Sequence, residues 1–258
     1  GDDLPTPETT IAEFVTSTVL SRLSKSSVQG LDKLSLEPFP IQRNNSLSDQ
    51  IVDILDEAAI LKWGESGFEA HHLIRNVHSA AMDEVTKASI HANLAAHWSA
   101  IQGHEARAFE MHHRIAAGQS LDQDLAKSVS KESESAIAAS LLSDALEREN
   151  RDDLRILSAN VAISRGEASA AREIASDIAE GLDRWKIELE CARMSGDDKE
   201  RSRIEGLLLD QLPDSEKARV LVRGAIAMHD DRLPGPLDQD LGIRLTKRLN
   251  QTEGISSE

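Results

Sequence analysis

The sequence predicts an all-α protein with one small β-hairpin, in which the hairpin segment is followed by an array of helix pairs. Three observations predict this fold class. Apolar residues recur at the spacing of amphipathic helices through most of the 258 residues. One short run of strand-forming residues is interrupted by a turn with a glycine at each end. Further along the chain, three glycines have apolar residues at the same offsets before and after them, which indicates a repeat.

The N-terminal segment predicts two helices. Residues 6–8 (TPE) supply a cap, a first-turn proline and an acid that the helix dipole favours. A second, shorter helix follows through Val28, Leu31 and Leu34. Pro38 and Pro40 then end helical structure, because proline has no amide hydrogen to donate.

The next segment predicts a third helix and then a hairpin. Ser46 or Ser48 is expected to cap the helix. Two short strands, residues 60–63 and 68–71, flank the turn at residues 64–67 (GESG). Three helices followed by a hairpin is the layout of a winged helix. Its small core is expected to include Ile54, Leu55, Trp63 and Phe68.

The rest of the chain predicts helices only. Segments aligned on Gly103, Gly166 and Gly196 place apolar residues nine and five positions before each glycine, and eight and twelve positions after it. This pattern indicates a helix, a left-handed glycine exit and an antiparallel second helix. Gly166 and Gly196 lie 30 residues apart, close to the tetratricopeptide (TPR) period of about 34 residues. We therefore expect a TPR-like α-solenoid, with two buried seams formed by Leu94, Trp98, Met111 and Ile115 and by Leu157, Val161, Ile174 and Ile178.

A winged helix followed by helical repeats resembles the C-terminal half of signal-transduction NTPases of the STAND class, which includes maltose-type regulators. The most specific match is the stretch from Ala70 to Arg75 (AHHLIR), where the family often has Met-His-Asp-Leu-x-Arg. His71, Leu73 and Arg75 match the family pattern, whereas Ala70 and His72 depart from it. The segment at residues 101–118 (IQGHEARAFEMHHRIAAG) is similar to the passage from wing to repeats.

The resemblance implies a nucleotide-sensing role for His71 and Arg75 where an NTPase domain is present. In the family, the histidine at the position of His71 reaches the ADP phosphate and holds the closed state. This sequence has no Gly-x4-Gly-Lys-Ser/Thr phosphate loop. Within this chain, the simpler expectation is that His71 caps the corner between strand and helix by hydrogen bonding. No cofactor is expected.

Histidines are concentrated in one part of the chain, because eight of the nine lie between His71 and His113. Their spacing does not favour a metal site. Adjacent pairs point to different sides of an element, and no His-Glu-x-x-His motif is present. The sequence therefore predicts no metal site and no catalytic residue. A site formed by tertiary contact, for example between His78 and His112, stays open as an alternative.

Charge and composition indicate the partners. The net charge of −16 opposes binding to a phosphate backbone, and the predicted reading helix, residues 48–59, carries acids and no base. We expect no nucleic-acid and no membrane partner. The single cysteine, Cys191, excludes an internal disulfide, fits a reducing compartment and predicts a cytoplasmic protein. Cys191 itself is expected to fill the core of a repeat helix.

These observations predict a winged-helix domain at residues 4–82, a TPR-like repeat domain at 83–250 and a flexible tail at 251–258. The predicted function is a non-enzymatic regulatory region of a STAND-type NTPase. Its repeats would bind a protein partner or effector, and its wing would couple to the NTPase domain of the same full-length chain. The alternatives are a free-standing TPR-like adaptor or scaffold, and a histidine-dependent metal-binding enzyme.

Overall fold

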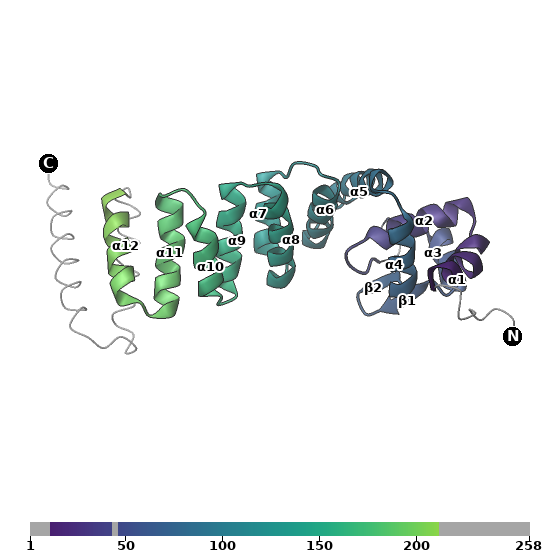
Figure 1. Ribbon diagram of the computed structural model, residues 1–258, viewed down its shortest axis with the longest axis horizontal. Coiled ribbons are helices and arrows are strands. Elements are labelled where there is room, and N and C mark those ends of the chain that lie inside the picture. The colour runs from purple at the N-terminus through teal and green to yellow at the C-terminus, as the bar shows by residue number, and fades with distance from the viewer. Residues whose placement is uncertain (1–10, 43–45, 212–258) are drawn as a thin grey trace. The chain divides into compact units, whose positions relative to one another are not determined.

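The computed structural model describes residues 11–42 and 46–211. Contacts divide the chain into two compact units, with the division between Arg165 and Gly166. Most of the described structure is helical, and one two-stranded antiparallel sheet is present among the described residues (Figure 1). The first unit comprises α1 (Ile11–Thr18), the short 3-10 helix η1 (Leu20–Arg22), α2 (Lys25–Leu36), α3 (Asp49–Glu57), β1 (Leu61–Gly64), β2 (Gly67–Ala70), α4 (His72–Ala81), α5 (Glu84–Ser99), α6 (His104–Ala116), α7 (Gln123–Glu132), α8 (Ser135–Arg148) and α9 (Asp152–Ser164).

Helix α2 is the central element of the first part of this unit. Its N-terminus is capped by Ser24, whose hydroxyl oxygen accepts a hydrogen bond from the backbone N–H of Ser27. The helix contacts α3, α4, α5 and β2, and it buries Leu31 and Leu34 among them. We call the described residues between 11 and 82 the hairpin module.

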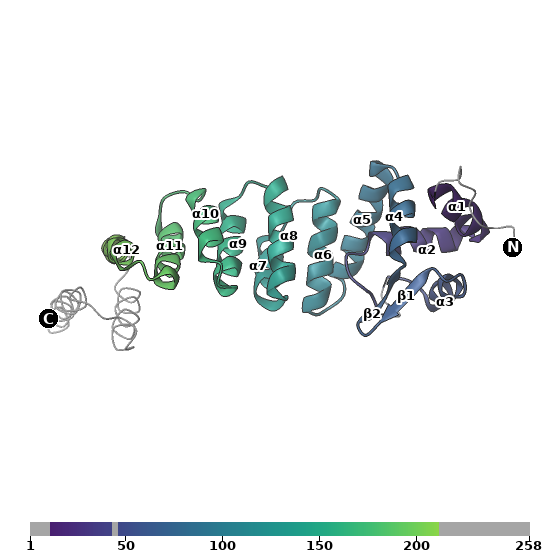
Figure 2. The ribbon, with the colours of Figure 1, turned by 60° about the horizontal axis from the view of Figure 1, so that its bottom comes forward.

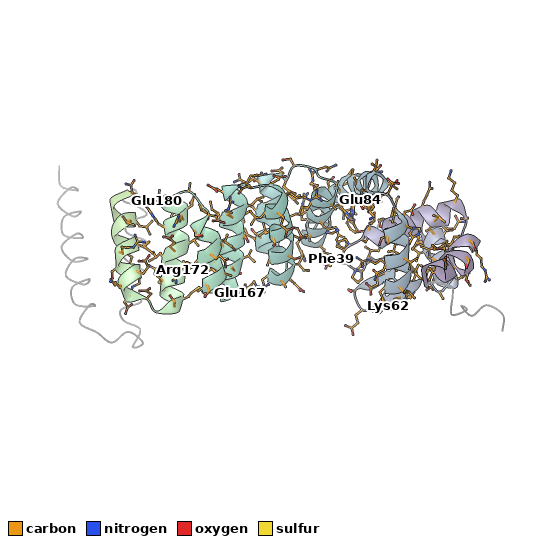
Figure 3. The ribbon with its side chains drawn as sticks, viewed as in Figure 1. Phe39, Lys62, Glu84, Glu167, Arg172 and Glu180 are labelled. Carbon is orange, nitrogen blue, oxygen red and sulfur yellow. The ribbon has the colours of Figure 1, made fainter. Side chains whose placement is uncertain are left out.

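The hairpin forms where the sequence predicts it. Leu61 pairs with Ala70 and Gly64 with Gly67, so the strands close on a turn that has a glycine at each end. Ile41 adds a bridge on the other side of β2, because Ile41 and Phe68 exchange two backbone hydrogen bonds of 2.9 Å. Lys62 of β1, labelled in Figure 3, pairs with Glu69 of β2 across the hairpin, with its ammonium 3.3 Å from the carboxylate.

The core of the hairpin module differs in part from the expected one. Leu55 and Phe68 are fully buried, as predicted. Trp63 is 44% exposed: its ring contacts Phe68 at a centroid distance of 5.0 Å, and its indole N–H donates to Asp56 at the surface. Ile54 is half-buried and lies outside the buried cluster. The strand carrying Trp63 is the outer edge of the sheet, which explains why its side chains face solvent.

Within the first unit, helices α5 to α9 pack with their neighbours in sequence (Figure 2). The connections are short, for example residues 100–103 between α5 and α6, and short connections produce antiparallel neighbours. Two buried apolar clusters fill the unit. One includes the hairpin module with Trp98 and Phe109, and the other runs from α6 to α9. Phe39 packs against both clusters.

The second unit contains three described helices, α10 (Ala168–Ser176), α11 (Leu182–Ser195) and α12 (Asp198–Gln211). Helix α11 contacts both α10 and α12. Leu189, Ile204 and Leu208 form a buried cluster between α11 and α12. Cys191 is buried in α11, as the sequence predicts, and burial raises the pKa of its thiol. Such a thiol fills space and is a poor nucleophile.

The glycine positions follow the predicted repeat in part. Gly196 ends α11 in the left-handed region, with φ 67° and ψ 24°, and Gly166 has φ 81°. The carboxylate of Asp197 accepts from the backbone N–H of Glu200 at the start of α12. Gly103, in contrast, does not end α5: it has φ 123° and precedes α6 as its N-cap residue.

The two predicted seams have different outcomes. Leu94, Trp98, Met111 and Ile115 are all buried, but they do not form a single seam. The first two belong to the cluster of the hairpin module, and the other two to the cluster of α6 to α9. The seam expected across Gly166 would join the two units, so it stays a prediction.

The predicted domain boundaries also stay predictions. The boundary between residues 82 and 83 falls inside the first compact unit. The expected cap at residues 6–8, the end of the repeat domain at residue 250 and the tail at 251–258 lie outside the described residues. Within residues 73–211 no strand follows the hairpin, as expected. None of the helices in the described part of the chain has the length and apolar character needed to cross a membrane.

Gly67 offers a direct test of the hairpin geometry. It has φ 135°, and a Cβ placed there would overlap the carbonyl oxygen of Ile41. Gly67→Ala should therefore lower the free energy of unfolding by about 1–3 kcal/mol, measured by urea denaturation. Gly64→Ala is the matched control, because its nearest atom is 3.9 Å away. Equal stability of the two variants would contradict the close approach of Ile41 to β2.

Candidate functional site

A buried carboxylate joins the hairpin module to the first helix pair. Glu37 follows the last residue of α2, and its side chain is only 1% exposed. Both carboxylate oxygens accept from the indole N–H of Trp98 at 3.2 Å. One oxygen also lies 2.9 Å from Nε2 of His113, whose side chain is fully buried. These bonds connect α2 to α5 and α6, and they supply the partners that a buried charge requires.

The hydrogen-bond chain continues from His113 to a second histidine. Nδ1 of His113 lies 2.8 Å from Nδ1 of His91, which is on α5. Because an ionised Glu37 only accepts, Nε2 of His113 donates to it. Nδ1 of His113 then either accepts the proton of His91 or donates to it, depending on whether His113 is neutral or charged.

His91 and a neighbouring histidine, His112, have strongly lowered pKa values. Burial, and after it the charge of His113, lowers the pKa of His91 to about 4. The same two causes, in the same order, lower the pKa of His112 to about 3. Arg148 adds to the effect on His91, and Arg75 adds to the effect on His112. Both imidazoles are therefore neutral at pH 7, and each has one ring nitrogen with a free lone pair.

His91, His112 and His113 form one cluster, which we call the histidine cluster. Each offers a ring nitrogen, and these nitrogens all lie within 4.8 Å of one another. The ring of His91 lies 5.8 Å from that of His112 and 5.1 Å from that of His113, measured between centroids. His91 thus contacts both members of the adjacent pair on α6. Three imidazoles at this spacing are a ligand set typical of a transition metal such as zinc.

Packing between α5 and α6 holds the cluster in place. The rings of Trp98 and Phe109 stack at a centroid distance of 4.2 Å, and Phe39 meets Phe109 edge-on at 5.4 Å. Trp98 thus uses its ring for packing and its N–H for Glu37. The aromatic contacts fix the register of the two helices, and that register brings His91 opposite His113.

The sequence prediction of no metal site rested on a geometric argument that the structure corrects. Adjacent histidines do point in different directions from α6, but His91 on the neighbouring helix reaches both. The alternative pairing of His78 with His112 is wrong: Nε2 of His78 bonds Asp32 of α2 at 2.7 Å. A sequence signal existed, because His91 lies about one turn before Leu94 on the face expected to meet α6.

His71 and Arg75 lie at the start of α4. His71 is exposed and occupies the N-cap position, but its side chain makes no capping hydrogen bond. The expected hydrogen-bonded cap is therefore wrong. The backbone N–H of His71 instead donates to the carbonyl of Ile60 at 2.7 Å, which ties the start of α4 to the hairpin. Arg75 is half-buried, one turn further along the helix. The nucleotide-sensing role implied by the resemblance stays a prediction.

A cleft of about 430 Å³ opens where the loop after α2 faces α6 and α8. Phe39, labelled in Figure 3, contributes to one wall. A smaller hollow of about 230 Å³ shares part of this lining and is also lined by Ile101 and Trp98. The lining combines apolar and acidic side chains, among which are Phe39, Phe109, Ile137, Glu105, Glu132 and Glu134.

A comparison with protein-family models, curated proteins and solved structures found no match to this chain.

The lowered pKa values predict how stability depends on pH. The unfolded chain takes up protons on these histidines near the ordinary pKa of about 6.5, whereas the folded chain resists protonation down to about pH 4 at His91 and about pH 3 at His112. The contribution of the neutral imidazoles to the free energy of unfolding is therefore fully present above about pH 6.5, and it is lost as the pH falls toward 4. We expect the free energy of unfolding to fall over this range.

His112→Ala should make that fall shallower, because one depressed group is removed. Denaturant melts in the presence of a chelator, at a series of pH values, measure the slope. His104→Ala, an exposed position at the start of α6, is the control and should keep the wild-type slope. A His112→Ala slope equal to the wild-type slope would show that His112 is not buried as a neutral group.

Proposed function

We propose that this chain is a non-enzymatic regulatory and protein-interaction region, in which a winged-helix module is followed by TPR-like helix pairs. The main support for the proposal is the pair of buried hydrogen bonds from Trp98 and His113 to Glu37. They connect the hairpin module to α5 and α6, so that a movement of the module would be passed to these helices. A region that passes a signal from one part to another needs such a connection. The resemblance to STAND-type NTPases implies the same role.

The arrangement of the hairpin module supports the winged-helix part of the proposal. Helices α2 and α3 pack against each other, and β2 packs on α2. Ile41 bridges β2 on the edge opposite β1, in the place of a short third strand. A small sheet of this order beside a helical bundle fits a winged helix.

The surface of α3 supports a packing role for the wing and opposes a DNA-binding role. Asp49, Asp53, Asp56 and Glu57 are all exposed on this helix. A DNA-reading helix needs cations or neutral polar groups that face the phosphates. Four exposed acids in nine residues would instead repel them. The proposed partner is therefore a protein.

The cleft beside α6 and α8 indicates the chemistry of that partner. Apolar side chains such as Phe39 and Ile137 line it together with Glu105, Glu132 and Glu134. Such a surface is complementary to a peptide segment that presents an apolar side chain flanked by Lys or Arg. We propose a basic, apolar segment of a protein partner as the occupant.

The exposed His71 supports coupling to an NTPase domain. Its side chain is accessible at the corner between β2 and α4, and Arg75 follows on the same face of the helix. An exposed imidazole is available to donate to a phosphate on a neighbouring domain. The coupling requires a phosphate-binding loop elsewhere in the full-length chain.

Two peptide arrays test the partner chemistry. Both carry the same apolar positions, and they differ only in whether the spacers are Lys and Arg or Asp and Glu. We expect the chain to bind peptides of the basic array saturably and more weakly as salt rises, because the contribution of exposed charges is screened. Glu105→Lys should weaken this binding severalfold, as measured by fluorescence anisotropy with the best basic peptide.

Glu57→Lys is the matched control, because it makes the same charge change on α3, outside the cleft. It should leave the peptide affinity nearly unchanged. Equal binding of the acidic and basic arrays, or equal effects of the two substitutions, would contradict the proposed partner surface.

A further inference from the structure

We propose that the histidine cluster binds a divalent transition metal of the zinc class, with His91, His112 and His113 as its three protein ligands. This site is independent of the peptide cleft and of the proposed regulatory role. It joins α5 to α6 at the position where Glu37 already attaches the hairpin module. A metal ion there would add to the stability of that junction.

The spacing of the three imidazoles fits a zinc ion after small adjustments. Zinc–nitrogen bonds of about 2.0–2.1 Å place tetrahedral ligand nitrogens about 3.3 Å apart. The Nδ1 atoms of His91 and His113 are 2.8 Å apart, so they need to separate by about half an ångström. The cluster nitrogens all lie within 4.8 Å, which leaves His112 within reach by side-chain rotation. Three ligands leave a fourth position for water.

Glu37 gives the cluster the outer partner that metal-bound histidines commonly have. Its carboxylate accepts from Nε2 of His113 at 2.9 Å, and this bond fixes the tautomer in which Nδ1 carries the lone pair. A metal between the two Nδ1 atoms takes the place of the hydrogen that they share. That hydrogen is the ring proton of neutral His91, and it moves from Nδ1 to Nε2 of the same ring, so every ring stays neutral and no proton is lost.

The protonation state and the access route both favour binding. His91 and His112 are neutral at pH 7, because their pKa values are about 4 and about 3. Protons therefore do not compete for these ligands in the neutral range. His112 is only partly buried, which gives an ion a path from solvent. The nearby charges of Arg75 and Arg148 reduce the attraction for a cation, so we expect weaker binding than in a four-ligand structural zinc site.

The experiment is a titration of zinc into the full chain, measured by isothermal calorimetry at neutral pH. The chain is first treated with a chelator, and the chelator is then removed. We expect one bound ion per chain, and a rise in thermal midpoint that grows with free zinc concentration. His112→Ala should abolish or strongly weaken this binding. It is the most informative variant, because His112 makes no hydrogen bond that holds the fold among the described residues. Glu37→Gln should weaken binding about 10–100-fold while all three ligands remain.

The double variant His71→Ala/His72→Ala is the matched control. These exposed neighbours, with rings 4.8 Å apart, could hold an ion on the surface. The double variant should bind zinc as the wild type does. Absence of saturable binding by chain that circular dichroism shows to be folded would overturn the proposal. So would wild-type binding by His112→Ala, or loss of binding in the double variant, which would assign the ion to the surface pair.

Discussion

The junction between the hairpin module and the helix pairs depends on one buried carboxylate. Glu37 carries a charge that is almost fully removed from water, and such a charge is strongly destabilising unless it is paired and hydrogen-bonded. Its partners, Trp98 and His113, lie 61 and 76 residues further along the chain. Only an arrangement that brings α2, α5 and α6 together satisfies it. Breaking that arrangement would leave an uncompensated buried charge, which costs about 3–5 kcal/mol in comparable cases.

Several features of the molecule follow from this constraint. Phe39, two residues after Glu37, is held against Phe109 and forms one wall of the cleft. His113 is held in the orientation that presents Nδ1 to His91. The proposed peptide surface and the proposed metal site therefore both include residues that contact, or follow closely after, Glu37. A ligand at either one would act on the junction between the hairpin module and the helix pairs.

Local patterns in the sequence predicted the elements well. The glycine-flanked turn, the helix through Leu31 and Leu34 and the left-handed Gly196 each depend on residues close in sequence, which is the reason they were predictable. The exposed Trp63 was not predicted, because hydrophobicity alone does not reveal which strand is the edge of a sheet. Gly103 was expected to end α5 by analogy with the other two glycines, but it precedes α6 instead.

The site was harder to predict, because it depends on contacts between distant residues. Glu37 looks like an ordinary acid at the end of a helix, and nothing beside it in sequence indicates burial. The histidines were noticed, but spacing along one helix could not show that His91 reaches both His112 and His113. That arrangement depends on the relative register of α5 and α6, which the stacked Trp98 and Phe109 determine.

Hydrogen exchange measured by mass spectrometry, comparing the wild type with Trp98→Phe, tests the central role of Glu37 most directly. The substitution keeps an aromatic ring against Phe109 and removes the N–H that Glu37 accepts, together with the five-membered part of the indole. Leaving a buried acceptor short of a donor costs about 1–3 kcal/mol. The account predicts that amides of α2 and β2 lose protection together with those of α5 and α6, while α8 and α9 change little. Loss of protection in α5 alone, with α2 and β2 unchanged, would contradict it.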